Sequence, residues 1–140
     1  MSTQKGRIFI SYRRADSAGY AGRIYDRLTD HFDKDAIFMD VVQIGAGLDF
    51  VEVLENAVQS CNVLVALIGK NWLNIKDEDG KRRLDNPQDF VRIEIATALK
   101  RGIHVIPVLI DGTPMPSANK LPENLKALER HSTIAQATRI

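Results

Sequence analysis

Short apolar runs alternate along the chain with segments whose apolar residues recur at helical spacing. Apolar runs at 7–12, 36–39, 62–68 and 104–110 predict β-strands, and a weaker run at 133–135 predicts a short last strand. The run at 62–68 is nearly all apolar, which is typical of a strand buried on both faces of a parallel sheet.

Helical periodicity fills the intervals between these strands. A first helix is expected after Asp16, which can cap it, and a second begins with Asp49 and Glu52, whose spacing is that of a capping box. Each helix has one apolar face. The faces consist of Ala21, Ile24, Tyr25, Leu28 and Phe32 in the first helix, and of Phe50, Val53, Leu54, Ala57, Val58 and Cys61 in the second.

A third helix is predicted to start at Asn86, a capping residue, and Pro87, which suits the first helical position. Asp89 would then lie in the first turn, where the helix dipole favours a carboxylate. Gly102 is a frequent kind of C-terminal stop. A last helix is predicted over 122–128.

These repeated strand–helix units imply a flavodoxin-like α/β fold of three layers. About five parallel strands in the order 2-1-3-4-5 would have helices on both faces. Pro107 cannot donate a ladder hydrogen bond, so we expect an edge or bulge position there. Residues 74–86 are polar and predict a long exposed loop. Ligands of such sheets bind beyond the carboxyl ends of strands one and three, where the loops 11–16 and 69–72 begin.

Composition limits the possible classes. The 140 residues suit a single domain over 1–140 with a core at about 7–135, and 44% hydrophobic with 26% charged residues indicates a soluble globular domain. The net charge of +1 provides no general attraction for nucleic acid or an anionic membrane. One cysteine excludes an internal disulfide, and no apolar segment has the length of a signal peptide or a membrane span. We therefore expect a cytoplasmic protein.

The sequence lacks the motifs of several familiar functions of doubly wound folds. Neither G-x-x-x-x-G-K-S/T nor G-x-G-x-x-G occurs, so the usual phosphate-binding loops are absent. Ser11 to Arg14 and Gly69 stand where a response-regulator receiver needs its acidic residues, and the first loop is too basic for flavin phosphate. The three histidines are scattered and Cys61 lies on an apolar helix face, so no metal site is predicted.

Glu94 is the main candidate for chemistry. It follows Phe90 by four residues, so the two side chains share one face of the third helix. An aromatic ring beside a carboxylate suits a ligand that has a flat ring and a hydroxylated sugar. The alternative is that Glu94 is an ordinary solvated helix residue.

Five segments in order resemble Toll/interleukin-1 receptor (TIR) domains of bacterial type. Phe9 to Arg14 resembles their first signature box. The segment from Phe38 to Phe50, with its glycine-bearing BB loop, resembles their second strand and loop. The turn 69–72 and the strand 106–108 fit the same pattern, and 89–99 resembles the catalytic helix of the NAD-cleaving branch. The resemblance runs from about Arg7 to Arg130.

The resemblance implies a role for particular residues. Glu94 takes the position of the catalytic glutamate, and Phe90 takes a place that is often tryptophan in active members. Arg13 and Arg14 match basic residues near the nucleotide. The candidate substrate site is completed by Ser11, Tyr12, Phe50 and Trp72.

Each of these assignments has an alternative. Phe50 starts an apolar helix face and could be core, and Trp72 could cover a strand end. Arg13 and Arg14 could be solvated or pair with Asp16, and Ser11 with Tyr12 could be polar caps of a strand.

The implied activity is NAD nucleosidase chemistry. Nicotinamide leaves the ribose as a neutral molecule, so the reaction needs no general acid, in contrast to ordinary glycoside hydrolysis. One carboxylate on the ribose hydroxyls can orient the sugar and stabilise its developing oxocarbenium charge, without metal or cofactor. Capture by water gives ADP-ribose, and capture by a group of the same molecule gives a cyclic ADP-ribose isomer.

The resemblance also implies assembly. Ile44, Gly45 and Gly47 form a candidate contact loop, because glycines permit unusual backbone conformations and exposed apolar residues mark contacts. The alternative is that the apolar side chains of this loop fold back on the core. We expect self-association with other TIR domains in bacterial defence signalling, with a sensor domain or a separate partner protein. The alternative is a non-catalytic TIR adaptor that acts by TIR–TIR association.

Overall fold

The computed structural model of the protein describes residues 6–39, 50–130 and 135–137. Their strands form one parallel sheet in the order β2-β1-β3-β4-β5, which confirms the predicted topology. The strands are β1 (Ile8–Ser11), β2 (Ile37–Phe38), β3 (Val63–Ile68), β4 (His104–Ile110) and β5 (Ala135–Ala137).

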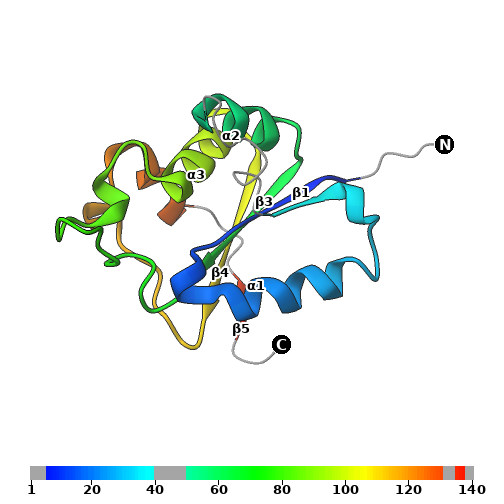
Figure 1. The fold of residues 1–140 in the computed structure, drawn as a ribbon, viewed down its shortest axis with the longest axis horizontal. Coiled ribbons are helices and arrows are strands. Elements are labelled where there is room, and N and C mark those ends of the chain that lie inside the picture. Colours follow the sequence, from blue (N-terminus) through cyan, green and yellow to red (C-terminus); the bar gives the residue numbers. More distant parts are fainter. Residues whose placement is uncertain (1–5, 40–49, 131–134, 138–140) are drawn as a thin grey trace.

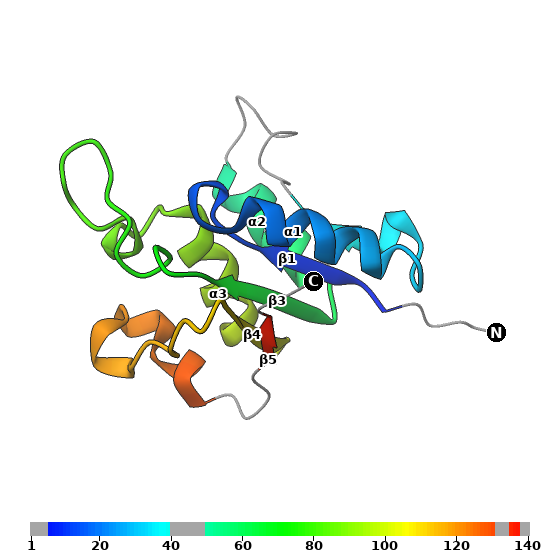
Figure 2. The ribbon, with the colours of Figure 1, turned by 90° about the horizontal axis from the view of Figure 1, so that it is seen from below.

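Helices cover both faces of this sheet (Figures 1 and 2). Helix α1 (Arg14–Leu28) lies on one face, and α2 (Phe50–Gln59) and α3 (Phe90–Lys100) lie together on the other. Four 3-10 helices complete the described elements, and η5 packs against α3. They are η1 (Lys34–Ala36), η3 (Arg83–Asp85), η4 (Ala118–Lys120) and η5 (Glu123–Arg130).

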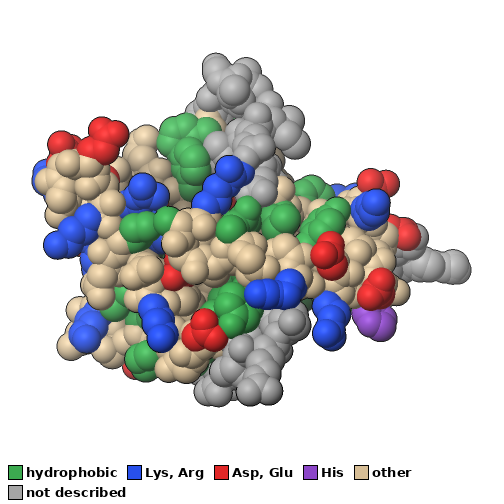
Figure 3. Space-filling model, turned by 60° about the horizontal axis from the view of Figure 1, so that its bottom comes forward, with side chains coloured by type: hydrophobic (Ala, Val, Ile, Leu, Met, Phe, Trp, Pro, Cys, Tyr) green, Lys and Arg blue, Asp and Glu red, His purple; other side chains and the backbone are tan. Residues whose placement is uncertain are grey.

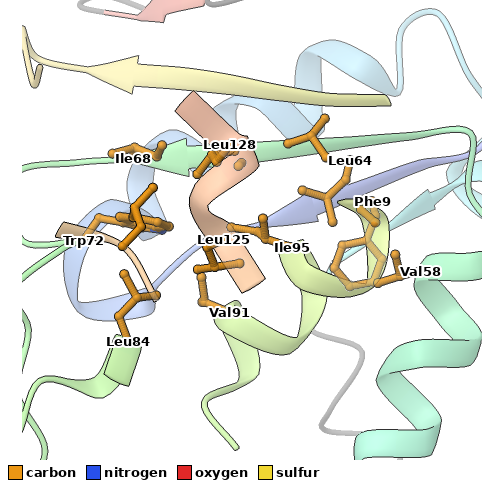
Figure 4. Close-up of a cluster of buried hydrophobic side chains, with 14 of the residues drawn as sticks. Phe9, Val58, Leu64, Ile68, Trp72, Leu84, Val91, Ile95, Leu125 and Leu128 are labelled. Carbon is orange, nitrogen blue, oxygen red and sulfur yellow. The ribbon is translucent and has the colours of Figure 1, made fainter. Parts of the chain in front are cut away.

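The period of two along each strand divides the core into two clusters. The cluster on the side of α2 and α3 (Figure 4) takes Phe9, Leu64, Ala66, Ile68, Val105 and Leu109 from the sheet. The alternate positions Ile10, Leu67, Val108 and Ile110 pack on the side of α1. Because both faces are apolar, the inner strands appear in the sequence as continuous hydrophobic runs.

Helix α3 starts three residues later than the sequence predicted. Asp89 is its N-cap, and the carboxylate accepts a hydrogen bond from the backbone N–H of Arg92. Asn86 instead accepts a hydrogen bond from the N–H of Gln88 and closes a turn before the helix. Gly102, with φ of 73°, follows the C-cap, so the predicted end is confirmed.

Asp16 does not cap α1, contrary to prediction. Its carboxylate accepts hydrogen bonds from the backbone N–H groups of Gly69 and Asn71, beyond the end of β3. Helix α1 is kinked at Ser17, whose φ of −144° and ψ of 27° are not helical.

Two further predictions need correction. β4 is an inner strand, so Pro107 is not on an edge strand, and the pairing with β5 that the described residues show starts at Val108. The last predicted helix is a 3-10 helix, η5. The polar segment 74–86 is exposed over most of its length, as predicted, and a bridge between Lys76 and Arg82 gives it the form of a hairpin.

Charged side chains are interspersed on the face turned forward in Figure 3, where the described surface gathers neither sign into one patch. No helix among the described residues combines the length and the apolar character that crossing a membrane requires.

Candidate functional site

Glu94 is a buried carboxylate in the middle of an apolar helix. It lies on α3 between the buried side chains of Ile93 and Ile95, and 8% of its own surface is exposed. Charged residues are seldom buried without a structural or functional reason. The solvated-helix alternative for Glu94 is therefore wrong.

Phe90 and Phe50 bring α3 and α2 together at the start of both helices. Their ring centroids are 4.8 Å apart and the rings are tilted by 60°, a favourable geometry for an aromatic pair. Phe90 remains 40% exposed and lies one helical turn before Glu94. The pair thus leaves one aromatic surface open to a flat ligand beside the buried carboxylate.

Arg13 has a partner that the sequence did not indicate. Two nitrogens of its guanidinium donate to the two carboxylate oxygens of Asp89 at 3.0 and 2.8 Å, and Nε donates to the carbonyl of Trp72 at 3.2 Å. The ion pair is almost fully buried. This corrects the expectation that Arg13 contacts a nucleotide, because its donors face inward. Arg14, the next residue, is exposed at the start of α1.

Trp72 and Ser11 are closed to a ligand as well. Trp72 has no exposed surface and belongs to the core cluster shown in Figure 4, so it does not offer a stacking face. Ser11 ends β1 and is 1% exposed. Tyr12 is half-buried against the cluster on the side of α1. The structural alternatives fit better than ligand contact for Trp72 and Ser11.

The switch point between β1 and β3 is occupied by the protein itself. Asp16 holds the N–H groups of Gly69 and Asn71 at 2.9 and 2.8 Å, and these groups would otherwise be free to bind an anion. A Cβ at Gly69 would lie 2.5 Å from the Asp16 carboxylate. The place where flavodoxin-like folds commonly bind ligands is thus closed by an internal carboxylate.

A cavity of about 270 Å³ opens beside Phe90, at the N-terminal end of α3. Its described lining is Asp77, Arg83, Asn86, Gln88, Asp89 and Phe90. A second cavity, of about 640 Å³, lies over α2, α3 and Asn124. Glu94 lines neither of these two cavities. Phe90 lines the first cavity and lies one helical turn before Glu94.

Cys61 is a core residue, as predicted. Burial raises the pKa of its thiol to about 11, so the thiol stays protonated near neutral pH and is a poor nucleophile. Within the described ranges, no three histidine, cysteine or acidic side chains gather as metal ligands would.

Three of the predicted residues, Ile44, Gly45 and Gly47, fall outside the described residues.

The sequence analysis did not identify Arg83 or the cavity beside Phe90, because residues 74–86 have the composition of an exposed loop. The spacing of Asp77, Asp79 and Gly80 is typical of a turn and could have indicated a hairpin.

Comparison with known proteins gives a consistent result. A sequence model of the family described as the TIR domain matches residues 8–137. The NAD(+) hydrolase sarm1 of Drosophila melanogaster is 28% identical over 123 residues, which are 86% of this chain and 8% of that protein. The chain thus spans less than a tenth of the length of this curated relative.

A solved structure has a similar fold. The TIR domains of the activated Roq1 resistosome, which directly recognizes the pathogen effector XopQ, superpose with a TM-score of 0.58. They are 17% identical in sequence, and the match covers 90% of this chain and 70% of that chain.

Proposed function

Since this chain belongs to the TIR domain family, we propose that it is an NAD nucleosidase that cleaves the nicotinamide–ribose bond. The observation that carries the proposal is the buried carboxylate of Glu94 one helical turn from the exposed ring of Phe90. The similarity to an NAD(+) hydrolase over most of this chain supports it.

The proposed mechanism gives each group one task. The Glu94 carboxylate binds the ribose hydroxyls and stabilises the positive charge that develops on the sugar as nicotinamide leaves. A carboxylate acts strongly there because the surroundings are apolar and exclude water. Phe90 holds a flat ring by stacking, and its own ring packs against Phe50.

A single carboxylate is sufficient for this reaction because the nicotinamide ring of the substrate is already positively charged. Nicotinamide departs with the bonding electron pair and becomes neutral, so no side chain must donate a proton to it. The ribose cation then combines with water, which releases a proton and gives ADP-ribose, or with a nucleophilic group of the same nucleotide, giving a cyclic isomer. We propose both products as members of one reaction class.

We further propose that activity depends on self-association with other TIR domains and serves bacterial defence signalling. A sensor domain or a partner protein would supply the trigger. The support is the resemblance of the segment 38–50 to the BB loop of this family.

The decisive experiment measures nicotinamide release from NAD by chromatography at high protein concentration. We compare the parent protein with Glu94→Gln, which keeps the size of the side chain and removes its charge. Release by the parent and none by folded Glu94→Gln supports the proposal, with folding checked by circular dichroism. Release at the parent rate from Glu94→Gln contradicts the assignment. A folded parent that releases none at any concentration favours the TIR adaptor.

A further inference from the structure

Three consecutive cations of the hairpin have different surroundings. Arg82 donates two hydrogen bonds to Asp85, at 2.6 and 3.2 Å. Arg83 lines the cavity beside Phe90, and in the described part of the chain no carboxylate pairs with its guanidinium. Lys81 is exposed and does not line this cavity. Arg83 is thus the one cation that the hairpin presents to the cavity.

The backbone fixes the place of Arg83. Its N–H donates to the carbonyl of Ile75 at 2.8 Å, and the neighbouring Arg82 forms the bridge with Lys76. Arg83 also begins η3, whose Leu84 is anchored in the core. The side chain is therefore exposed on a supported backbone, which limits the entropy lost when it binds a ligand.

The two acids that line the same cavity are already engaged. One Asp77 oxygen accepts hydrogen bonds from the N–H groups of Asp79 and Lys81, at 2.9 and 3.0 Å. Asp89 is neutralised by the bidentate Arg13. Asp77 keeps its negative charge, but one of its oxygens is already occupied by backbone N–H groups. Arg83 is the cation in the described lining of the cavity, and it has no described carboxylate partner.

We propose that Arg83 binds the diphosphate of the dinucleotide whose sugar is held at Glu94. This inference rests on the proposed function and adds a substrate-binding residue to it. The cavity lies beside Phe90 at the N-terminal end of α3, and Glu94 lies one helical turn beyond Phe90. At about 270 Å³ the cavity suits only part of a dinucleotide.

An arginine suits this task because its planar guanidinium can donate two parallel hydrogen bonds to phosphate oxygens. The resemblance placed Arg13 and Arg14 near the nucleotide, but the guanidinium of Arg13 donates to Asp89 and Trp72. Arg83 can provide this cation from a different element, η3.

The test measures binding rather than turnover. The full chain carrying Glu94→Gln is titrated calorimetrically with ADP-ribose, with inorganic pyrophosphate and with adenosine, which lacks phosphate. Arg83→Gln is added to this background, and Lys81→Gln serves as the matched control because it removes the same charge from the same hairpin. Circular dichroism confirms the fold of each variant.

We expect Arg83→Gln to weaken ADP-ribose and pyrophosphate binding about tenfold or more while adenosine binding stays unchanged. Lys81→Gln should change the affinity for ADP-ribose and for pyrophosphate by less than about twofold, because an exposed charge outside the site is screened by salt. Equal loss in both variants, undiminished binding in Arg83→Gln, or no phosphate-dependent binding by the Glu94→Gln protein itself overturns the inference. Binding that depends on Arg83, in a parent protein that releases no nicotinamide, upholds it and refutes only the proposed reaction.

Discussion

Arg13 and Asp89 form a buried bidentate ion pair across 76 residues of sequence. Arg13 follows β1, and Asp89 caps the helix that carries Glu94 and Phe90. The same guanidinium also holds the carbonyl of Trp72, after β3. One side chain therefore ties the ends of two central strands to the start of α3, and it orients the candidate catalytic helix relative to the sheet.

Removing one partner of this pair should be costly. Asp89→Asn leaves Arg13 buried without a counter-charge and weakens the cap of α3, so we expect a loss of about 3–5 kcal/mol in the free energy of unfolding. Urea denaturation measures the loss. Asp85→Asn is the control, because it breaks the exposed pair with Arg82 and should cost about 1 kcal/mol or less. Equal losses in the free energy of unfolding would show that the buried Arg13–Asp89 pair contributes no more to stability than the exposed Arg82–Asp85 pair.

A methyl group at Gly69 should displace the Asp16 carboxylate. The new Cβ would lie 2.5 Å from a carboxylate oxygen, so Gly69→Ala should lose hydrogen bonds and cost about 1–3 kcal/mol of stability. Gly22→Ala, at an open position inside α1, should instead stabilise the protein by about 0.5–1 kcal/mol. Thermal denaturation of both variants provides the comparison. The same sign for both changes would contradict the close approach at Gly69.

Trp72 should matter for stability and not for catalysis. Trp72→Ala should destabilise the fold by about 3–5 kcal/mol because the side chain is fully buried. Trp72→Phe keeps most of the packing, so its rate of nicotinamide release per folded molecule should match that of the parent. A large rise in KM for a folded Trp72→Phe variant would contradict this prediction and indicate that Trp72 contacts the substrate.

The strand order was readable from the sequence because each strand is a short apolar run and each crossover is helical. Glu94 and Phe90 could be paired from their spacing alone. The partner of Arg13 could not, since Asp89 is distant in sequence and its carboxylate was interpreted as a simple dipole effect. Asn86-Pro87 looks like a helix start, yet tertiary bonding to Arg13 favours Asp89 as the cap.

Phe90 should contribute a stacking surface to activity. We expect Phe90→Ala to lower kcat/KM for NAD about tenfold, and Phe90→Trp to retain most of it, because a larger ring preserves the contact area. Phe32→Ala is the control, since Phe32 is the other large apolar side chain that the described surface exposes, and it should leave kcat/KM unchanged. Equal turnover by the alanine and tryptophan variants at Phe90 would remove this residue from the site.

The last prediction concerns self-association through the loop that contains Ile44 and Gly47, which lies outside the described residues. If two copies must meet to complete a site, specific activity rises with protein concentration, because the assembled fraction rises by mass action. Ile44→Asp places a charge in an apolar contact, and Gly47→Pro restricts the backbone, so both should lower the activity and flatten its dependence on concentration. Lys81→Gln, on the hairpin, is the control that should leave the concentration dependence intact. Sedimentation velocity at the assay concentrations checks that assembly, not folding, has changed. Specific activity that is constant over a wide concentration range, and indifferent to both loop substitutions, would mean that one copy suffices and that this loop serves the core of its own domain.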